Sequence, residues 1–445
     1  MEWVYNMMII SRGDDRVKKV IGEQKYIHNR YVKSIYAYIM SEGEDYVVYN
    51  LFTKEILRLS GDEVSSFFLS DYAIKNWFAV PSNECEWQLV ENVREILYLF
   101  DCNIKNHKSY KYTIFTTMDC NAHCSYCFEK KLRKKEYMSL EKAQVICEYI
   151  INKTPHKPVY ITWFGGEPLL NTEVIDYISE KLTSSGIEFH SNMFTNAYLF
   201  DEMKIARAKK MWKVECVEIT LDGTESTYNQ VKGIQPTDGV SPYKRVIENI
   251  KILLDNEIKV VVRLNVSDNN KNELLCLIDS IMYLFDVYKN IETHIEKVYQ
   301  KIAGETTCHT PAVLESSYLD IVKYCVDRKI YSPTMHTIER MKTSNCYADR
   351  YEGLIMYPNG NLGICEHYPN KFIIGNIDNF EIDTDMIDVF RERYQIMEKC
   401  KMCMFLPDCI RMKNCDFHFE ECIDEYINTR KYFMLIKLQE VLRKE

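Results

Sequence analysis

Three cysteines lie within eight residues, at Cys120, Cys124 and Cys127, in the stretch Cys-Asn-Ala-His-Cys-Ser-Tyr-Cys. Thiolates so close together on a loop can converge on one soft metal centre. A closed structural zinc site takes four ligands, and a fully ligated iron–sulfur cluster takes four thiolates. Three thiolates therefore leave one position for a ligand that is not protein. Half of a zinc site and three unrelated buried thiols are the alternative interpretations.

The elements that must position this loop follow a repeating pattern. Apolar stretches typical of strands alternate with amphipathic stretches of helical period, such as residues 139–151 and 243–255. Alternating strands and helices imply a parallel sheet. The pattern predicts an α/β fold, an incomplete (β/α)6 barrel, with strands at residues 112–117, 159–164, 188–195, 217–221, 259–266 and 291–298.

In parallel barrels the chemistry is placed at the carboxyl ends of the strands. The three cysteines follow the first predicted strand, and a Gly-Gly-Glu-Pro turn follows the second. Glycine lets backbone approach a ligand closely, although such a turn is more often only a turn. Polar residues at the later ends are candidates for ligand contacts, with an ordinary ion pair as the alternative for the arginine: Ser191, Thr195, Asp222 and Arg263.

These motifs together resemble the radical S-adenosylmethionine (SAM) enzymes. Their signature is Cys-x3-Cys-x2-Cys with an aromatic residue before the last cysteine, as Tyr126 is here. The resemblance implies that Cys120, Cys124 and Cys127 hold a catalytic [4Fe–4S] cluster. The fourth iron then binds SAM, which is split to give a 5′-deoxyadenosyl radical.

The resemblance also implies a set of SAM contacts. One position departs from it, because Lys232 stands where relatives often have an arginine after the Leu-Asp-Gly stretch, and lysine lacks the bidentate fork. Asp222 could either orient substrate or cap the following segment. The expected SAM-binding residues are Tyr126, Gly165, Gly166, Glu167, Pro168, Ser191, Thr195 and Arg263.

A second group of cysteines lies near the C-terminus, seven in 77 residues. Their spacing resembles the SPASM domain of radical SAM enzymes that modify peptides and proteins, except that five residues rather than three separate Cys409 from Cys415. The alternative is a pair of zinc sites. The resemblance implies two auxiliary [4Fe–4S] clusters, one on Cys400, Cys403, Cys409 and Cys422, the other on Cys346, Cys365 and Cys415. The latter is completed by Asp349 or Glu352 or left with an open iron.

The first hundred residues predict a small α+β domain, with strands at 34–40, 46–51 and 55–59, a helix that starts near Ser60 and another at 84–100. This order is similar to the winged-helix domains that recognise peptides in many peptide-modifying radical enzymes. In those domains a leader peptide adds a strand to an exposed sheet edge. A structural cap on the barrel is the alternative.

Composition limits the other classes of function. The chain has 445 residues, 46% of them hydrophobic, a net charge of −9 and 17 cysteines. The negative charge disfavours a nucleic-acid partner. The sequence contains no apolar run of about 18 residues, so it predicts no membrane-spanning helix. We expect a cytoplasmic protein with three domains: residues 1–108 for leader recognition, 109–335 as the radical SAM barrel and 336–445 as the SPASM domain.

The expected function is that of a radical SAM peptide maturase. It would install an oxidative crosslink, foremost a cysteine thioether, in a ribosomally made precursor peptide that carries a leader. The expected cofactors are SAM and three [4Fe–4S] clusters, with an electron donor of flavodoxin or ferredoxin type. The alternatives are a protein oxidase like the anaerobic sulfatase maturases, a carbon–carbon crosslinking or epimerising enzyme, and a zinc-dependent scaffold without catalysis.

Overall fold

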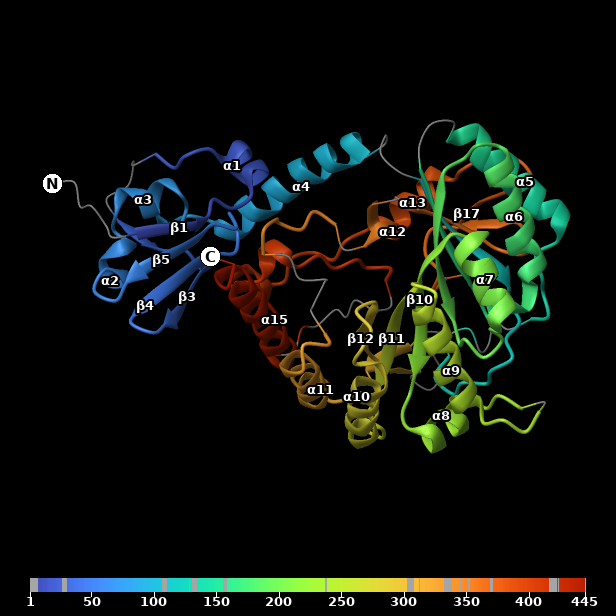
Figure 1. The fold of residues 1–445 in the computed structure, drawn as a ribbon. Coiled ribbons are helices and arrows are strands. Elements are labelled where there is room, and N and C mark those ends of the chain that lie inside the picture. The colour runs from blue at the N-terminus through green and yellow to red at the C-terminus, as the bar shows by residue number, and fades with distance from the viewer. Residues whose placement is uncertain are drawn as a thin grey trace.

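The structure is a computed structural model. It describes residues 7–25, 30–105, 110–127, 129, 134–154, 158–236, 238–301, 308–311, 313–331, 338–344, 346–350, 353–368, 371–415, 422 and 424–444. Figure 1 shows an N-terminal unit, residues 7–105, on the left and a larger body around a long sheet on the right. The domain boundaries expected at 108/109 and 335/336 lie outside the described residues. No helix in the described ranges is long and apolar enough to cross a bilayer.

The N-terminal unit is a small α+β body. Its main sheet is antiparallel, with the strand order β1-β5-β4-β3, and no other described strand pairs with the outer side of β3. Ser60 does not start a helix as expected, because it ends β5 and α2 follows Glu63. The elements are β1 (Met7–Ser11), α1 (Asp15–Ile21), β2 (Tyr31–Lys33), β3 (Ala37–Glu42), β4 (Asp45–Asn50), β5 (Ile56–Ser60), α2 (Val64–Phe67), α3 (Asp71–Lys75), β6 (Ala79–Pro81) and α4 (Glu86–Lys105).

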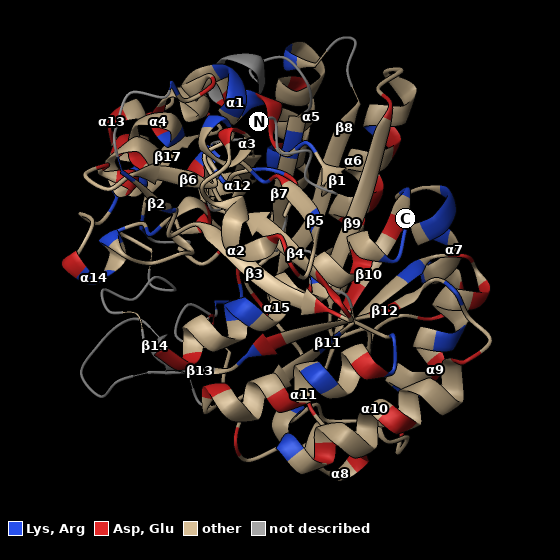
Figure 2. Ribbon diagram, turned by 90° about the vertical axis from the view of Figure 1, so that its left-hand side faces the viewer, with Lys and Arg blue, Asp and Glu red and all other residues tan. Residues whose placement is uncertain are grey.

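The larger body contains the expected partial barrel. Strands β7 to β12 are parallel neighbours in chain order, and the helices lie on their outer side (Figures 1 and 2). The elements are β7 (Tyr110–Thr117), α5 (Leu140–Lys153), β8 (Val159–Gly165), the 3-10 turn η2 (Pro168–Asn171), α6 (Thr172–Ser184), β9 (Phe189–Thr195), α7 (Glu202–Lys210), β10 (Val214–Leu221), α8 (Glu225–Lys232), α9 (Pro242–Asp255), β11 (Lys259–Val266), α10 (Lys271–Phe285) and β12 (Ile291–Lys297).

The side chains of each barrel strand alternate between two environments. On β8, Ile161 and Trp163 pack in the core between sheet and helices, while Thr162 and Phe164 are only partly buried on the concave face. Local chemistry fixes the helices: the Ser139 hydroxyl caps α5, and α9 begins at Pro242, where a missing N–H costs nothing.

Three later strands extend the barrel sheet, which the sequence pattern does not predict. β15 runs parallel to β7, and β16 and β17 follow it antiparallel, so that the sheet has nine strands. Covering the edge of β7 removes an unpaired row of backbone groups. The remaining elements are β13 (Tyr299–Lys301), β14 (Cys308–Pro311), α11 (Glu315–Asp327), α12 (Tyr347–Arg350), β15 (Gly353–Met356), β16 (Asn361–Gly363), β17 (Ile373–Asn376), α13 (Thr384–Arg391), α14 (Glu398–Lys401), η3 (Leu406–Asp408) and α15 (Asp424–Leu442).

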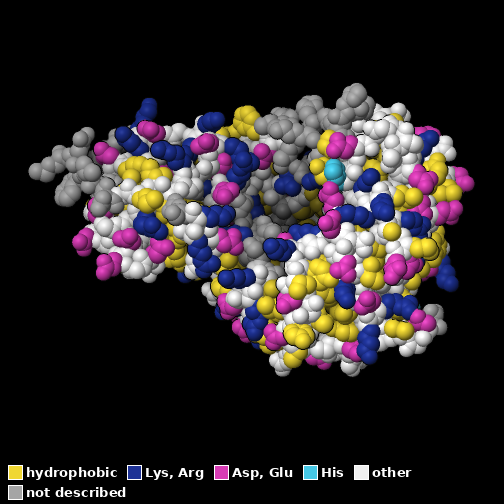
Figure 3. Space-filling model, viewed as in Figure 1, with side chains coloured by type: hydrophobic (Ala, Val, Ile, Leu, Met, Phe, Trp, Pro, Cys, Tyr) yellow, Lys and Arg dark blue, Asp and Glu magenta, His cyan; other side chains and the backbone are white. Residues whose placement is uncertain are grey.

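The N-terminal unit and the C-terminal segment share a hydrophobic core. Tyr36, Phe52 and Val90 pack in one cluster with Leu406 and Leu438. In the space-filling view, the surface is hollowed between the N-terminal unit and the barrel body (Figure 3). The N-terminal unit is therefore built into the molecule and is not an appendage on a linker.

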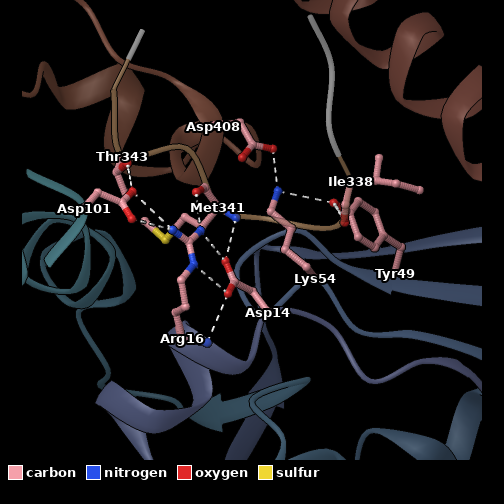
Figure 4. Close-up of polar contacts among 9 residues, drawn as sticks. All are labelled: Asp14, Arg16, Tyr49, Lys54, Asp101, Ile338, Met341, Thr343 and Asp408. Carbon is pink, nitrogen blue, oxygen red and sulfur yellow. Dashed lines mark hydrogen bonds and ion pairs between the residues drawn. The ribbon is translucent and has the colours of Figure 1, made fainter. Parts of the chain in front are cut away.

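Polar contacts reinforce this interface (Figure 4). The Asp14 carboxylate accepts from the Met341 backbone N–H at 3.0 Å and from the Arg16 guanidinium at 2.8 Å. Arg16 also donates to the Met341 carbonyl at 3.2 Å and to Asp101 at 3.1 Å. Asp101 in turn accepts from the Thr343 hydroxyl at 2.6 Å. Two carboxylates of the N-terminal unit thus hold the chain at residues 341–343.

Candidate functional site

The cysteine loop leaves the carboxyl end of β7. Cys124 is buried and Cys120 and Cys127 are half-buried, and none of the three forms a disulfide. The Asp119 carboxylate accepts from the Cys120 N–H at 2.9 Å, and the Cys120 sulfur accepts from the Ala122 N–H at 3.4 Å. The loop therefore presents three thiols, none of them in a disulfide, from a backbone that hydrogen bonds hold in place.

Gly165 and Gly166 hold this loop from the side of β8. Gly165 has φ +124°, and an added Cβ would lie 2.2 Å from the Thr117 carbonyl oxygen. A Cβ on Gly166 would lie 2.2 Å from the Asp119 oxygen, whose carbonyl accepts from the Glu167 N–H at 2.9 Å. Glycine is required at both positions because the backbone after β8 lies against the backbone at the base of the cysteine loop, and a side chain would collide with it.

Glu167 is fully buried directly beneath the loop. Its carboxylate accepts from the Thr195 hydroxyl at 2.6 Å, the Asn196 N–H at 2.8 Å and the Leu169 N–H at 3.1 Å. Burial raises the pKa of Glu167 to about 7, against the lowering effect of these donors. Pro168 is the first residue of the turn η2 and the side chain of Glu167 caps this turn. Glu167 therefore ties the end of β9 to the turn after β8.

Asn196 contacts the cysteine loop, and the sequence analysis did not name it as a site residue. Its side-chain amide donates to the Asn121 side chain at 2.7 Å and approaches the Cys120 sulfur at 4.0 Å. The Thr195 hydroxyl also accepts from the Ala197 N–H at 2.9 Å, so it is engaged on both sides. The signal for Asn196 in the sequence is its place immediately after a polar strand end.

Ser191 is not brought to this edge. It lies four residues before Thr195 on β9, a distance of about 13 Å along a strand. Its buried hydroxyl donates to the Trp212 carbonyl, before β10 begins, at 2.6 Å. The expectation that Ser191 contacts a ligand at the carboxyl ends took the whole polar stretch as the strand end. Ser191 faces the same side of β9 as Thr195, but its distance along the strand keeps it from the carboxyl edge.

Tyr126 belongs to a buried polar network. Its hydroxyl donates to Asp222 at 2.7 Å and lies 3.1 Å from the Lys232 ammonium, which forms an ion pair with Asp222 at 3.1 Å. Asn265 donates to the same carboxylate at 3.3 Å, and the Lys232 carbonyl accepts from the His123 N–H at 2.6 Å. Burial alone would lower the pKa of Lys232, but Asp222 and its other neighbours hold it well above its usual value.

This network resolves two questions from the sequence. Asp222 neither caps α8 nor points to an open site, because it joins the cysteine loop to β11 and to the end of α8. Lys232 is buried on the same carboxylate, so its ammonium holds the loop and is not free for a ligand carboxylate.

Arg263 lies on the concave face in a chain of charged groups. Its guanidinium donates to Glu218 at 3.1 Å and to the Asn265 side chain at 3.1 Å, and His294 lies 3.5 Å from the other Glu218 oxygen. Burial would raise the pKa of Glu218, but His294 and Arg263 keep it below its usual value. Arg263 therefore has the ion pair that the sequence left as an alternative, and it keeps a partly exposed side chain.

The other half of the concave face is aromatic. Phe115 lies 5.0 Å from Phe164 and 4.8 Å from Tyr357, and Phe164 lies 5.3 Å from Phe194, measured between ring centroids. The barrel therefore offers an aromatic wall on β7 to β9 opposite charged groups on β10 to β12. Such a combination suits a ligand with an apolar and a polar end.

The C-terminal cysteines gather in two groups. Burial raises the pKa of Cys365 well above its usual value, and Glu366 and the nearby thiolates of Cys346 and Cys415 add to this rise. We call Cys346, Cys365 and Cys415 the first cysteine group. Asp349 lies close enough to Cys346 to act on it electrostatically, as does Glu366, which the sequence analysis did not consider. Glu352 lies outside the described residues.

The second cysteine group contains Cys400, Cys403, Cys409 and Cys422. Burial raises the pKa of Cys403, and the thiolates of Cys409 and Cys400 raise it further, while Arg430 lowers it. Burial raises the pKa of Cys422, and the nearby thiolates of Cys409 and Cys403 raise it further. The electrostatic neighbours of Cys365, Cys403 and Cys422 thus fall within the two sets that the sequence analysis gives, and the assignment of either set to a cluster stays a prediction.

The donor sets fit iron–sulfur clusters. None of the ten cysteines forms a disulfide, and soft thiolates suit iron–sulfur chemistry. No three His, Cys, Asp or Glu side chains in the described ranges converge as ligands of a single metal ion. When a cluster is bound, its thiols are deprotonated outright, whatever their pKa without metal.

Comparison with known proteins agrees with the site. Residues 114–279 match the family model described as the Radical SAM superfamily, so this part of the chain is a radical SAM domain. Comparison with curated proteins finds no match. Among solved structures, anSMEcpe with bound AdoMet and Kp18Cys peptide is similar at 16% identity with a TM-score of 0.57, over 75% of this chain and 98% of that one.

A second solved structure covers more of the chain. SuiB of Streptococcus suis, bound to precursor peptide SuiA, is similar at 15% identity with a TM-score of 0.51, over 85% of this chain and 94% of that one. At these identities the likeness concerns the fold. The fold of the radical SAM domain and of much of its surroundings is therefore shared with solved structures that contain a bound peptide.

Proposed function

We propose that this radical SAM enzyme modifies a ribosomally made peptide by an oxidative crosslink, foremost a cysteine thioether. The observation that carries the proposal is the combination of four sites in one chain: the three-cysteine loop at the barrel mouth, two further cysteine groups, and an N-terminal sheet whose β3 edge no other described strand covers. Crystal structures of similar fold, anSMEcpe and SuiB, contain a bound peptide, which supports a peptide substrate.

The chain's own residues have separate parts in this function. Cys120, Cys124 and Cys127 would hold the catalytic cluster, and Asn196 and the network around Tyr126 fix the loop that carries them. When bound, the cluster and SAM supply the electron and the radical that abstracts hydrogen from the peptide. The aromatic wall and Arg263 would hold SAM and substrate on the concave face and exclude water from the radical.

The two other cysteine groups would hold auxiliary [4Fe–4S] clusters. A crosslink removes two hydrogen atoms from the peptide, and the radical step takes one of them, so one further electron and one proton must leave afterwards. The first cysteine group has three thiols and could leave an iron open to a substrate thiolate, or use Asp349 or Glu366 as its fourth ligand. A flavodoxin- or ferredoxin-type donor would supply the initial electron.

The open edge of β3 suits a leader peptide. The two-residue turn at Gly43 and Glu44 closes on the pair Glu42 and Asp45, and hydrogen-bonded pairs alternate along an antiparallel ladder. Ile39 and Ser41 therefore direct their backbone N–H and C=O groups away from β4. A peptide strand can pair with these groups, as in other sheet-edge complexes.

The leader interaction can be tested at this edge without removing the N-terminal unit, whose deletion would expose the shared core. Ser41→Pro removes an outward N–H at an exposed position, where an edge strand tolerates proline. We expect Ser41→Pro to weaken peptide binding tenfold or more and to leave SAM cleavage unchanged. The matched control is Ser41→Ala, which keeps the backbone N–H. Equal peptide affinity in both variants would contradict the proposal.

The reaction itself is tested by mass. The enzyme is co-expressed without oxygen with the peptide of the shortest neighbouring reading frame, and the product is weighed. Loss of two hydrogen atoms with disappearance of a free thiol supports the thioether. The same loss with thiols intact shows a carbon–carbon or carbon–oxygen link, and deuterium uptake from heavy water without that loss shows epimerisation. Formylglycine in a protein substrate would instead establish the maturase alternative.

A further inference from the structure

The N-terminal unit reaches the second cysteine group. Cys403 packs against the core that Tyr36, Leu51 and Phe52 form with Phe405 and Leu406. The Arg94 guanidinium, from α4, donates to the Leu406 carbonyl. The wall beside Cys403 and Cys409 is therefore built partly from residues more than 300 positions earlier in the chain.

A buried ion pair joins the same two regions (Figure 4). The Lys54 side chain is 0% exposed, and its ammonium lies 2.6 Å from the Asp408 carboxylate and 3.2 Å from the Tyr49 hydroxyl. Asp408 immediately precedes Cys409, and its carbonyl accepts from buried Arg430 at 3.0 Å. Lys54 thus fixes the backbone from which Cys409 projects.

Tyr36 has a buried hydroxyl that forms no hydrogen bond within the described ranges. Its side chain is 1% exposed. Leaving a buried hydroxyl unpaired costs about 1–3 kcal/mol, so such a group indicates a partner that protein atoms do not supply. The charged groups that act on this hydroxyl are, in decreasing order, Glu86, Arg94, the Cys403 thiolate and Glu91, and among them Cys403 belongs to a proposed cluster site. Cys403 also packs against the hydrophobic cluster that contains Tyr36.

We infer that the N-terminal unit forms part of the second auxiliary site, with the Tyr36 hydroxyl donating a hydrogen bond to the sulfur of the group bound there and Lys54 acting as a positioning residue for Cys409. This rests on the proposed function, since it requires an iron–sulfur cluster on Cys400, Cys403, Cys409 and Cys422. The leader-binding unit and the electron-accepting site are then one structure, and a donor from that unit helps to set the reduction potential of the cluster.

The sign of the effect follows from charge. Reduction adds an electron to the cluster, and hydrogen bonds to its sulfurs stabilise the more negative state. Tyr36→Phe removes the donor and keeps the ring that packs on Phe52, whose centroid lies 6.0 Å away. The variant therefore lowers the reduction potential without opening a cavity.

The test uses the full-length chain with Cys120, Cys124 and Cys127 changed to alanine, so that only auxiliary clusters remain, and EPR-monitored redox titration. We expect one auxiliary signal to shift to a more negative midpoint in Tyr36→Phe and no shift in Tyr46→Phe, a half-buried tyrosine of the same sheet. An unchanged midpoint in Tyr36→Phe, with iron bound, would overturn the inference alone. Iron content unaffected by Cys403→Ala would overturn the second cluster and the inference together.

Lys54 gives an independent measurement. Lys54→Met leaves Asp408 buried without its cation, and we expect the iron of the second group to be lost several-fold faster to a chelator. Adding Asp408→Asn removes the unpaired charge and should restore retention. Equal iron loss from wild type and Lys54→Met would refute the role of Lys54 as a positioning residue.

Discussion

The ion pair between Lys232 and Asp222 should hold the catalytic loop in place. Their side chains are 4% and 2% exposed and lie 3.1 Å apart. Removing one partner of a buried pair costs about 3–5 kcal/mol, because the other charge stays buried without compensation. Asp222 keeps its donors from Tyr126 and Asn265 in Lys232→Met, so we expect the lower end, about 3 kcal/mol.

Native-state hydrogen exchange reports this loss locally. The His123 N–H donates to the Lys232 carbonyl, which any side-chain substitution retains. A loss of about 3 kcal/mol corresponds to roughly 100-fold faster exchange at His123, since 1.4 kcal/mol is tenfold. The matched control is Lys259→Met, which breaks an exposed 2.8 Å pair with Glu292 and should cost less than about 1 kcal/mol.

The reasoning is refuted if Lys232→Met exchanges at His123 within a few-fold of wild type. It also requires that Lys232→Met combined with Asp222→Asn be less damaging than the sum of the single changes, because asparagine can still accept from Tyr126 while the unpaired charge is gone. A coupling of about 2 kcal/mol is expected from the double-mutant cycle.

The remaining predictions concern the loop, its glycine cradle and its buried carboxylate. Cys120→Ala should abolish SAM cleavage while most iron stays bound; intact cleavage would refute the catalytic cluster. Gly165→Ala should destabilise the loop by roughly 3 kcal/mol or more, because φ is +124° and the Cβ meets the Thr117 oxygen, whereas Gly186→Ala, with open space, should cost about 1 kcal/mol, as unfolding in urea would show. Glu167 has a folded pKa of about 7 against an ordinary 4.5, so the folded chain binds more protons in this window and stability falls as pH rises from 4.5 to about 7. The total is about 3 kcal/mol, and Glu167→Gln should remove it; the same slope in both proteins would contradict this assignment.

Local sequence determined much of the barrel. The strand at Lys259–Val266 has the predicted bounds, and α5 begins after Ser139, at the start of the predicted helical stretch 139–151. These elements depend on periodicity and on neighbouring residues, which the sequence displays directly. The extension of the sheet by β15 to β17 was not predictable in this way, because pairing with β7 joins residues more than 200 positions apart.

The site divides in the same manner. Spacing alone identified the thiols of Cys120, Cys124 and Cys127, because ligands on one short loop are close whatever the rest of the chain does. Spacing could not show that Ser191 lies away from the carboxyl edge or that Asn196 reaches the cysteine loop. Nor could it show that Lys232 forms a buried ion pair with Asp222. Those facts depend on strand register and on which side chains face each other across the barrel.

The sequence by itself thus determined the chemistry that the chain can perform, since residue types and short spacings set the ligands. Only the tertiary structure decided what surrounds that chemistry. It packed Tyr36 and Lys54 of the N-terminal unit against the segment of Cys403 and Cys409. Contacts between distant segments follow from how hydrophobic faces are buried together, and the order of residues along the chain does not reveal that packing.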